Sequence, residues 1–316
     1  MPALLATVLA LLASLTLYLA AATLIQRPMT VGELAPLIAR KVAYTQSLPG
    51  RRLLVLAGSN GRYSHRCEAL TQVTGWPCSN LSLAVGVGLD FQLMQFEPLM
   101  RTGDVLYLPL EYSQYAVERD EMEAGAENTL LLHHFPTLLW SLPLQRVARV
   151  YGSLEPSFLI HGVMEMVLQR LGTQRRSGLD SLTPQGDEFG HTAAASQAYR
   201  AFLASAAPAF DKPSLPAQSH ALAVVEAFLA RARVLEIQVV GGLPTAPIGI
   251  ALDAASLMRL QSIFARHGHT FLVLPSKSNY ALDCFHDTLY HLNQECQVAH
   301  SQAVGQAMAP LLQQGL

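Results

Sequence analysis

The chain has 316 residues, of which 51% are hydrophobic and only 14% are charged, and its formal net charge at pH 7 is −2. A chain this close to neutral has no basic stripe with which to neutralise phosphates, which argues against nucleic acid as a partner. The length suffices for one large α/β domain or for two small ones.

The first feature in chain order is an apolar run, Ala3–Ile25, that is rich in Leu and Ala and contains no charged residue. As a helix it could cross a hydrocarbon core of roughly 30 Å. The alternatives are a cleaved signal peptide, against which the lack of Lys and Arg before the run argues, and a buried core helix, which rarely stays uncharged for so long. We therefore predict a transmembrane anchor at residues 1–27, in contact with the membrane through residues 3–25.

Two features disagree about which side of the membrane the rest of the chain occupies. Basic residues follow the apolar run, and the positive-inside rule would keep them in the cytoplasm; they are Arg27, Arg40, Lys41, Arg51 and Arg52. The four cysteines instead fall into two local pairs, Cys67 with Cys78 and Cys284 with Cys296. If each pair forms a disulfide, the compartment is oxidising; four unpaired buried thiols are the alternative.

After the apolar run, helical patterns alternate with short apolar strands. Helices are expected over 31–48, 62–73 and 89–100, and strands at "RRLLVLAG", "WPCSNLSLAV" and "VLYLPLEY". The alternation returns after a helix at 219–232, with strands at "RVLEIQVVGG" and "HTFLVLPS" and helices over 254–267 and 297–312. Strands separated by helices and short turns predict an α/β fold with a central parallel sheet.

The middle of the chain interrupts this alternation. No strand is expected between about residues 116 and 216, where stretches such as "SFLIHGVMEMVLQRL" have a helical pattern. We interpret this segment as a helical insertion into an α/β domain that covers 28–316. Its apolar stripes are expected to pack into a core, with a surface lying on the bilayer as the alternative.

A serine stands where the first strand ends and a helix begins. Ser59 lies in "GSNG", at the carboxyl end of a strand, where open α/β sheets bind ligands, and the following helix offers free N–H groups to a developing oxyanion. The alternative is a capped turn with Ser59 or Asn60 as the N-cap. A nucleotide-binding turn is disfavoured because the Rossmann glycine spacing is missing.

A second polar segment, "NYALDCFHDTLYHLNQE", follows the last expected strand. It contains Asp283, His286, Asp287 and His291. A serine nucleophile needs a base within hydrogen-bond reach and a carboxylate that orients the base, and this segment can supply both. The alternatives are solvent-facing side chains or a zinc site, for which Glu111 is the only further ligand candidate. We predict neither a metal nor a cofactor.

These segments carry a family resemblance. "LAGSNGRYS" resembles the first sequence block of the SGNH (GDSL-like) hydrolases, "NLSLAVGVGLD" the second and "FHDTLYHLN" the last. Together with "EPLMRTGDVLYLPLEYSQY", they are similar to membrane-attached SGNH-like proteins associated with acylation of bacterial cell-surface polysaccharides. The resemblance covers Leu53–Tyr115 and Ile248–Leu312. It implies a flavodoxin-like three-layer fold.

The resemblance also implies roles for single residues. Ser59 would be the nucleophile, His291 the base and Asp287 the group that orients it, while Gly86 or Gly88 would donate an N–H to the oxyanion. Asp283 and His286 have the usual Asp-x-x-His spacing and are the alternative pair. His291 is preferred because "LN" and a helix follow it.

One position departs from the family pattern. An asparagine that donates to the oxyanion is expected after the third strand, where this chain has "PLEYSQY". Glu111 would be an anionic acceptor there and could not replace the donor. Asn60 or a backbone N–H is therefore expected to serve.

The expected function is a serine acyl-esterase or O-acyltransferase that acts on acylated cell-surface polysaccharide through an acyl-serine at Ser59. A membrane O-acyltransferase would be a further partner. The expected location is the inner membrane, with a single span and a periplasmic globular domain. The alternatives are a non-catalytic glycan-binding or scaffolding protein and a plain lipase or esterase.

Overall fold

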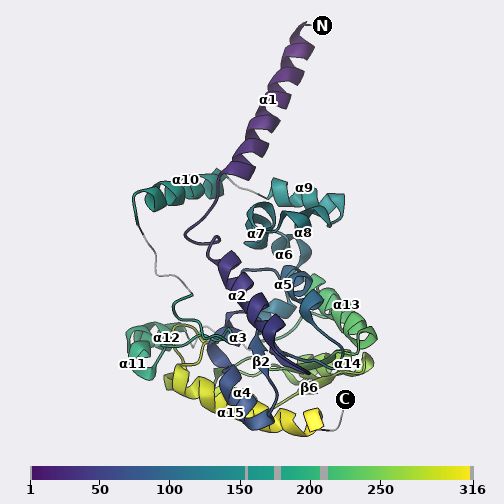
Figure 1. Cartoon of the computed structure of the whole chain (residues 1–316), viewed down its shortest axis with the longest axis vertical. Helices are drawn as coiled ribbons and strands as arrows, with labels where there is room; N and C mark the ends of the chain where they lie inside the picture. The colour runs from purple at the N-terminus through teal and green to yellow at the C-terminus, as the bar shows by residue number, and fades with distance from the viewer. Residues whose placement is uncertain (1, 154–155, 174–178, 207–212, 314–316) are drawn as a thin grey trace. The chain divides into compact units, whose positions relative to one another are not determined.

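The computed structural model describes residues 2–153, 156–173, 179–206 and 213–313 (Figure 1). The chain divides into two compact units, an N-terminal unit (Met1–Leu37 and Glu123–Gly178) and an α/β unit (Ile38–Met122 and Leu179–Leu316).

The bounds of the secondary structure follow in chain order. The helices are α1 (Pro2–Leu24), α2 (Leu34–Ser47), α3 (Ser59–Ser64), α4 (Cys67–Thr74), α5 (Leu89–Phe96), α6 (Arg119–Met122), α7 (Glu127–His133), α8 (Pro136–Trp140), α9 (Leu144–Gly152), α10 (Pro156–Arg170), α11 (Ala193–Ser196), α12 (Arg200–Ala206), α13 (His220–Val234), α14 (Ala254–Arg266) and α15 (Gln294–Gln313). The 3-10 turns are η1 (Glu97–Leu99), η2 (Tyr112–Tyr115), η3 (Gln197–Tyr199) and η5 (Leu282–Cys284). The strands are β1 (Leu53–Val55), β2 (Cys78–Asn80), β3 (Val105–Leu108), β4 (Gln238–Gly242), β5 (Ala246–Pro247), β6 (Thr270–Leu272) and β7 (Asn279–Tyr280).

The α/β unit is built on a parallel sheet of five strands in the order β2-β1-β3-β4-β6. The predicted α/β fold with a central parallel sheet is therefore confirmed. Because all five strands run the same way, their carboxyl ends share one edge of the sheet. β5 and β7 form a separate parallel pair of two residues each.

Helices cover both faces of this sheet. On one face, α4 and α15 pack against alternate residues of the central strands, among them Leu53, Val55, Val105 and Tyr107. On the other face, α13 and α14 contact β4, and α13 contacts α5. Burial on both faces explains why the central strands β1 (LLV) and β3 (VLYL) are continuous apolar runs rather than alternating ones.

The expected helix over 62–73 is two helices. The chain is extended at His65 and Arg66, between α3 and α4. Partners far along the chain stabilise the break, since the Arg66 N–H donates to Ser301 Oγ (2.7 Å) and the Cys67 N–H to Asp187 Oδ2 (3.0 Å). The break lets α3 lie at the end of the sheet while α4 covers its face.

The N-terminal unit begins with α1, which is long and apolar enough to span a membrane. In the same unit, α7 and α9 contact each other, and Leu130 and Leu131 of α7 and Val150 of α9 are fully buried. The expectation that the apolar stripes of the middle segment form a core is met by α7. It is wrong for α10, where Ile160, Val163, Met164, Val167 and Leu168 are exposed.

Candidate active site

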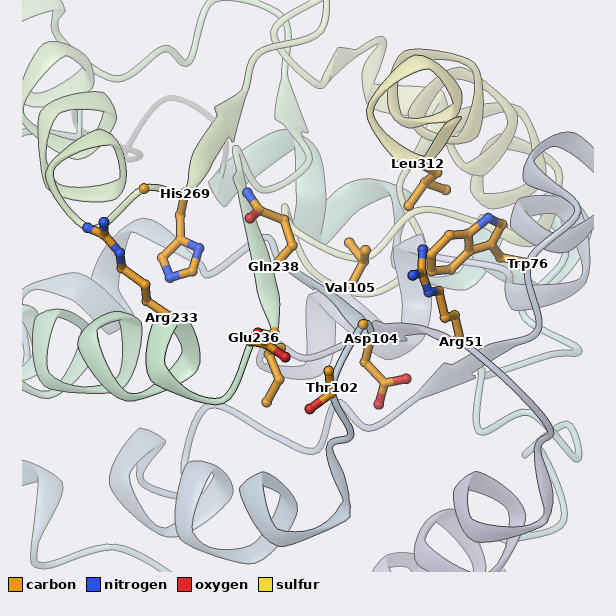
Figure 2. A pocket seen from close by; sticks show the side chains of 13 residues that line it. Arg51, Trp76, Thr102, Asp104, Val105, Arg233, Glu236, Gln238, His269 and Leu312 are labelled. Carbon is orange, nitrogen blue, oxygen red and sulfur yellow. The ribbon is translucent and has the colours of Figure 1, made fainter. Parts of the chain in front are cut away.

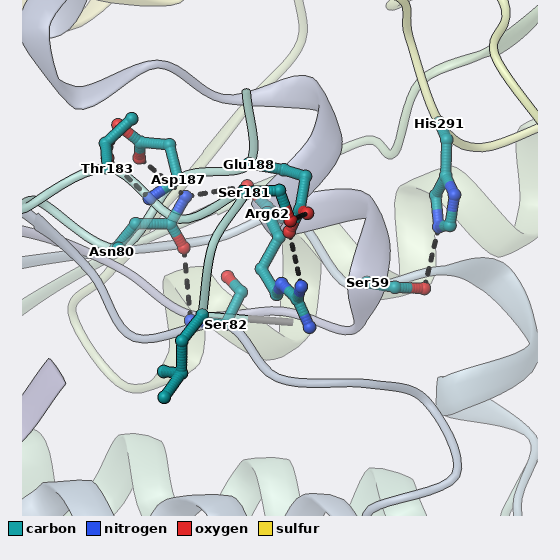
Figure 3. Close-up of polar contacts among 12 residues, drawn as sticks. Ser59, Arg62, Asn80, Ser82, Ser181, Thr183, Asp187, Glu188 and His291 are labelled. Carbon is teal, nitrogen blue, oxygen red and sulfur yellow. Dashed lines mark hydrogen bonds and ion pairs between the residues drawn. The ribbon is translucent and has the colours of Figure 1, made fainter. Parts of the chain in front are cut away.

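Ser59, His291 and Asp287 form a continuous hydrogen-bonded chain. His291 Nε2 lies 2.8 Å from Ser59 Oγ (Figure 3), and His291 Nδ1 lies 2.6 Å from Asp287 Oδ1. The structure thus brings together the three residues to which the sequence assigns nucleophile, base and orienting carboxylate. They lie beyond the carboxyl end of β1, the sheet edge at which ligands bind in folds of this kind.

The charge of Asp287 fits its place in this chain. Burial alone would raise the pKa of its carboxyl, but the hydrogen bond and positive charge of His291, helped by His286, outweigh burial and lower the pKa. An ionised Asp287 accepts the Nδ1–H of His291, which leaves Nε2 to accept the Ser59 hydroxyl proton.

Gly58 lets the turn before Ser59 pack tightly. A Cβ built at Gly58 would lie 2.5 Å from Val85 Cγ2, 3.0 Å from Glu111 Oε1 and 3.1 Å from Gln114 Oε1. Three segments, which follow β1, β2 and β3, therefore meet at this one glycine. An aspartate, the commoner residue before the serine in the resembled family, would not fit here.

A network beneath α3 holds the helix that begins at Ser59. The Asn80 side-chain amide donates to Gly61 O (2.8 Å) and Asp187 Oδ1 (3.0 Å), and Arg62 forms an ion pair with Glu188 (Figure 3). Sequence analysis assigned no role to Asn80, Asp187 or Glu188. The sequence signal that could have indicated Asp187 and Glu188 was "QGDEFG", a Gly-rich loop with two adjacent acidic residues in a chain of which only 14% is charged.

The segment that carries His291 is closed at both ends. Phe285 and Leu292 form an isolated antiparallel bridge, and a disulfide joins Cys284 to Cys296. The Tyr63 ring stacks on the His291 imidazole, with centroids 4.2 Å apart and planes 6° apart. Tyr63 follows Ser59 by four residues on α3, so the two side chains lie on the same helix face. That spacing was a readable signal that sequence analysis missed.

The alternative pair does not contact the serine. His286 Nδ1 lies 3.0 Å from Ser196 Oγ, and Asp283 is exposed. Instead, the His286 ring makes edge-to-face contacts with the rings of Tyr199 and His191, and His191 makes a contact of the same kind with Tyr63. Burial, together with the nearby His286, lowers the pKa of His191 to about 4, so this ring is neutral near pH 7.

The candidate oxyanion donors lie in different surroundings. Asn60 is completely buried and its amide donates to Pro109 O (2.8 Å), so its side chain does not face a substrate. Gly86 lies in an exposed turn beside Val85, and Gly88 is the N-cap residue of α5. Among the described residues, the backbone N–H groups of Ser59 and Gly86 have no hydrogen-bond partner. Neither N–H group is therefore committed to an acceptor in the described part of the chain.

Glu111 takes the place at which a donating asparagine was expected. The residue is only 6% exposed, and its carboxyl accepts the Asn60 backbone N–H at 3.3 Å. Burial raises the pKa of the Glu111 carboxyl to about 7, against the opposing effect of that hydrogen bond. Near neutral pH the group is therefore divided between its ionised and protonated forms. The expectation of a purely anionic acceptor was too narrow.

A cavity of about 390 Å³ lies at the opposite edge of the sheet (Figure 2). Arg51, Trp76, Arg233 and Glu236 line it, next to the amino ends of β3 and β4. Ser59 follows the carboxyl end of β1, and in a parallel sheet the amino and carboxyl ends of the strands lie on opposite sides. This cavity is therefore not part of the Ser59 site. Within the ranges that the structure describes, no group of three or more His, Cys, Asp or Glu side chains is placed to hold a metal ion.

No protein-family model matches the chain, and no curated protein matches it.

Proposed function

We infer that the protein is a serine acyl-esterase or O-acyltransferase of the SGNH type, with Ser59 as the nucleophile. One observation carries this proposal: His291 Nε2 lies 2.8 Å from Ser59 Oγ while Asp287 accepts from the other imidazole nitrogen. The strand order β2-β1-β3-β4-β6 supports it, because it is the 2-1-3-4-5 order of flavodoxin-like doubly wound sheets.

The geometry suits acyl transfer in two steps. In the first, His291 removes the Ser59 hydroxyl proton as Oγ attacks the acyl carbonyl, and the Ser59 and Gly86 N–H groups stabilise the oxyanion. His291 then gives the proton to the departing alcohol, which leaves an acyl-serine. In the second step, water or a sugar hydroxyl attacks the acyl-serine, and its proton returns through His291 to Ser59.

The proposed substrate is an acylated cell-surface polysaccharide, and the globular part lies on the extracytoplasmic side of the inner membrane. The disulfides Cys67–Cys78 and Cys284–Cys296 support this side, because such bonds persist in oxidising compartments. A reporter that matures only in the cytoplasm, fused after Leu316, should give no signal. A bright fusion would place the globular part in the cytoplasm instead.

Ester turnover by the full-length protein in detergent tests the chemistry. Release of acetate from an activated acetyl ester should fall to background in Ser59→Ala and His291→Ala, and on the order of 10³–10⁴-fold in Asp287→Asn. Ser47→Ala, at an exposed serine of α2, is the matched control and should keep full activity. An added oligosaccharide separates the two enzyme classes, because a transferase moves acetyl onto sugar faster than onto water.

A non-catalytic glycan-binding or scaffolding protein is the second candidate. Glu111 favours it, because a carboxylate in place of the expected asparagine would oppose a nearby oxyanion when ionised. A wild-type rate no higher than that of Ser59→Ala, with water and with sugar as acceptor, would select this candidate.

A further inference from the structure

Helix α10, in the N-terminal unit, exposes a continuous apolar stripe. The stripe, which ends one residue past the helix, consists of Ile160, Val163, Met164, Val167, Leu168 and Leu171. Their spacing of three and four residues places all of them on one helix face. Met164 is 54% exposed and Leu171 is 76% exposed, so the stripe is not packed against the protein.

The opposite face of α10 holds the helix in place. Glu165 accepts from Arg27 Nε (2.9 Å), from the Met29 N–H (3.0 Å) and from Thr30 Oγ1 (2.9 Å). A Cβ built at Gly162 would lie 2.6 Å from Ile25 Cγ2, so α10 lies directly against the chain that leaves α1. Gly162 and Glu165 thus face the protein while the large apolar side chains of the stripe are exposed, which is the reverse of the usual arrangement in a water-soluble unit.

The position of the stripe indicates what covers it. The residues that bind Glu165 follow α1, the candidate membrane span, within six positions of its last residue, Leu24. Figure 1 shows one end of α10 beside this end of α1, with α10 extending sideways from it. If α1 spans a bilayer, α10 lies where the chain emerges from it. Transfer of large apolar side chains from water to an apolar surrounding is favourable, so a bilayer at this level would stabilise the arrangement.

Other exposed residues of the N-terminal unit are of types that suit a membrane–water interface. His161 and Arg170 are exposed on α10 and flank the stripe on its two sides, at a level suited to lipid headgroups. Trp140 and Leu144, at the α8–α9 turn, are also strongly exposed. Tryptophan is enriched at membrane–water interfaces because its ring is amphipathic.

We propose that α10 is an interfacial membrane helix that lies in the leaflet from which α1 emerges, with its apolar stripe among the acyl chains. The bilayer itself is the occupant of the stripe. The N-terminal unit is thus a two-part anchor, with one helix that spans and one that lies along the surface. This proposal depends on α1 as a span and not on the chemistry at Ser59.

Spin labels on the full-length protein in phospholipid nanodiscs test the proposal. All four native cysteines are in disulfides, so an added cysteine is the only free thiol. A nitroxide at Met164→Cys, or at Leu168→Cys as a second stripe position, should collide with oxygen several-fold more often than with a water-soluble nickel chelate. At Gln169→Cys, which is exposed on the opposite face, the ratio should reverse.

Either of two results would overturn the proposal. Stripe labels as accessible to the nickel chelate as the Gln169→Cys label would mean that the stripe faces water. Stripe labels shielded from both reagents would mean that a second copy of the chain covers it. Thermal unfolding at the wild-type midpoint verifies that each labelled variant is folded.

Discussion

At the scale of single residues, the serine site depends on a glycine. Gly58 is where Val85, Glu111 and Gln114 approach the turn most closely. A larger residue would push Ser59 away from His291, and displacement of a reacting atom by about 1 Å can cost on the order of 10²-fold in rate.

We expect Gly58→Ala to lower both activity and stability. Its Cβ would overlap Val85 Cγ2 at 2.5 Å, and overpacking of this kind costs about 1–3 kcal/mol. Thermal unfolding and ester turnover measure the two effects. Gly152→Ala is the matched control, because a Cβ at Gly152 has nothing within 4 Å. A Gly58→Ala protein with wild-type turnover would contradict the tight packing described at this turn.

Sequence reasoning could select the candidate residues whose signal is local. Ser59 directly follows an apolar strand, and His291 lies four residues after Asp287, so both could be selected without knowledge of the fold. Asn60 could not be assigned correctly in this way. Its amide binds Pro109 O, which follows β3, and that contact depends on the order of the strands.

At the scale of elements, the strands and most helices could be predicted because each is a short apolar run or an amphipathic period between turns. The break between α3 and α4 could not, because Ser301 and Asp187 hold it from distant parts of the chain. The pair β5–β7 has only two residues per strand, too few for a periodic signal. Composition cannot tell whether the stripe of α10 faces a core or a bilayer.

The proposed catalysis at Ser59 requires that the segment between β7 and α15, which carries His291, be rigid. Removal of the Cys284–Cys296 disulfide by Cys284→Ser and Cys296→Ser should lower stability by about 3 kcal/mol, since it closes a loop with a separation of 12 residues. It should also lower kcat, because His291 lies within that loop.

The matched control is the double variant Cys67→Ser and Cys78→Ser. This second disulfide joins α4 to β2 and encloses no residue of the site. Stability should fall in both double variants, measured by thermal unfolding, but kcat should fall selectively in the first. Equal losses of kcat would count against a specific role for the closed His291 segment.

At the scale of the whole molecule, buried histidines make stability depend on pH. His65, between α3 and α4, and His300, in α15, are buried with their Nε2 atoms 3.3 Å apart. Burial lowers the pKa of His65 to about 4, and burial together with His65 lowers the pKa of His300. In the unfolded chain both histidines become protonated near pH 6.5, whereas in the folded protein they become protonated only at a lower pH. Stability is therefore lost as the pH falls from about 6.5 toward 4.

We expect His65→Gln to reduce the loss of unfolding free energy between pH 6.5 and pH 4 by up to about 3 kcal/mol. The measurement is the thermal midpoint at pH 7 and at pH 5, compared with His161→Gln, a substitution at an exposed histidine. Glu111 acts in the opposite sense, because its raised pKa removes stability as the pH rises from 4.5 through about 7. A His65→Gln protein as acid-sensitive as the control would refute the assignment to this buried pair.

The most direct test of the central claim is covalent modification of Ser59. A fluorophosphonate reacts with a serine whose hydroxyl is activated by a base, and intact mass reports one adduct per chain. For the full-length protein in detergent, we predict a single adduct that maps to Ser59, is absent from Ser59→Ala, and forms on the order of 10³-fold more slowly in His291→Ala. No adduct, an adduct at another residue, or labelling that His291→Ala leaves unchanged would contradict the assignment of Ser59 as an activated nucleophile.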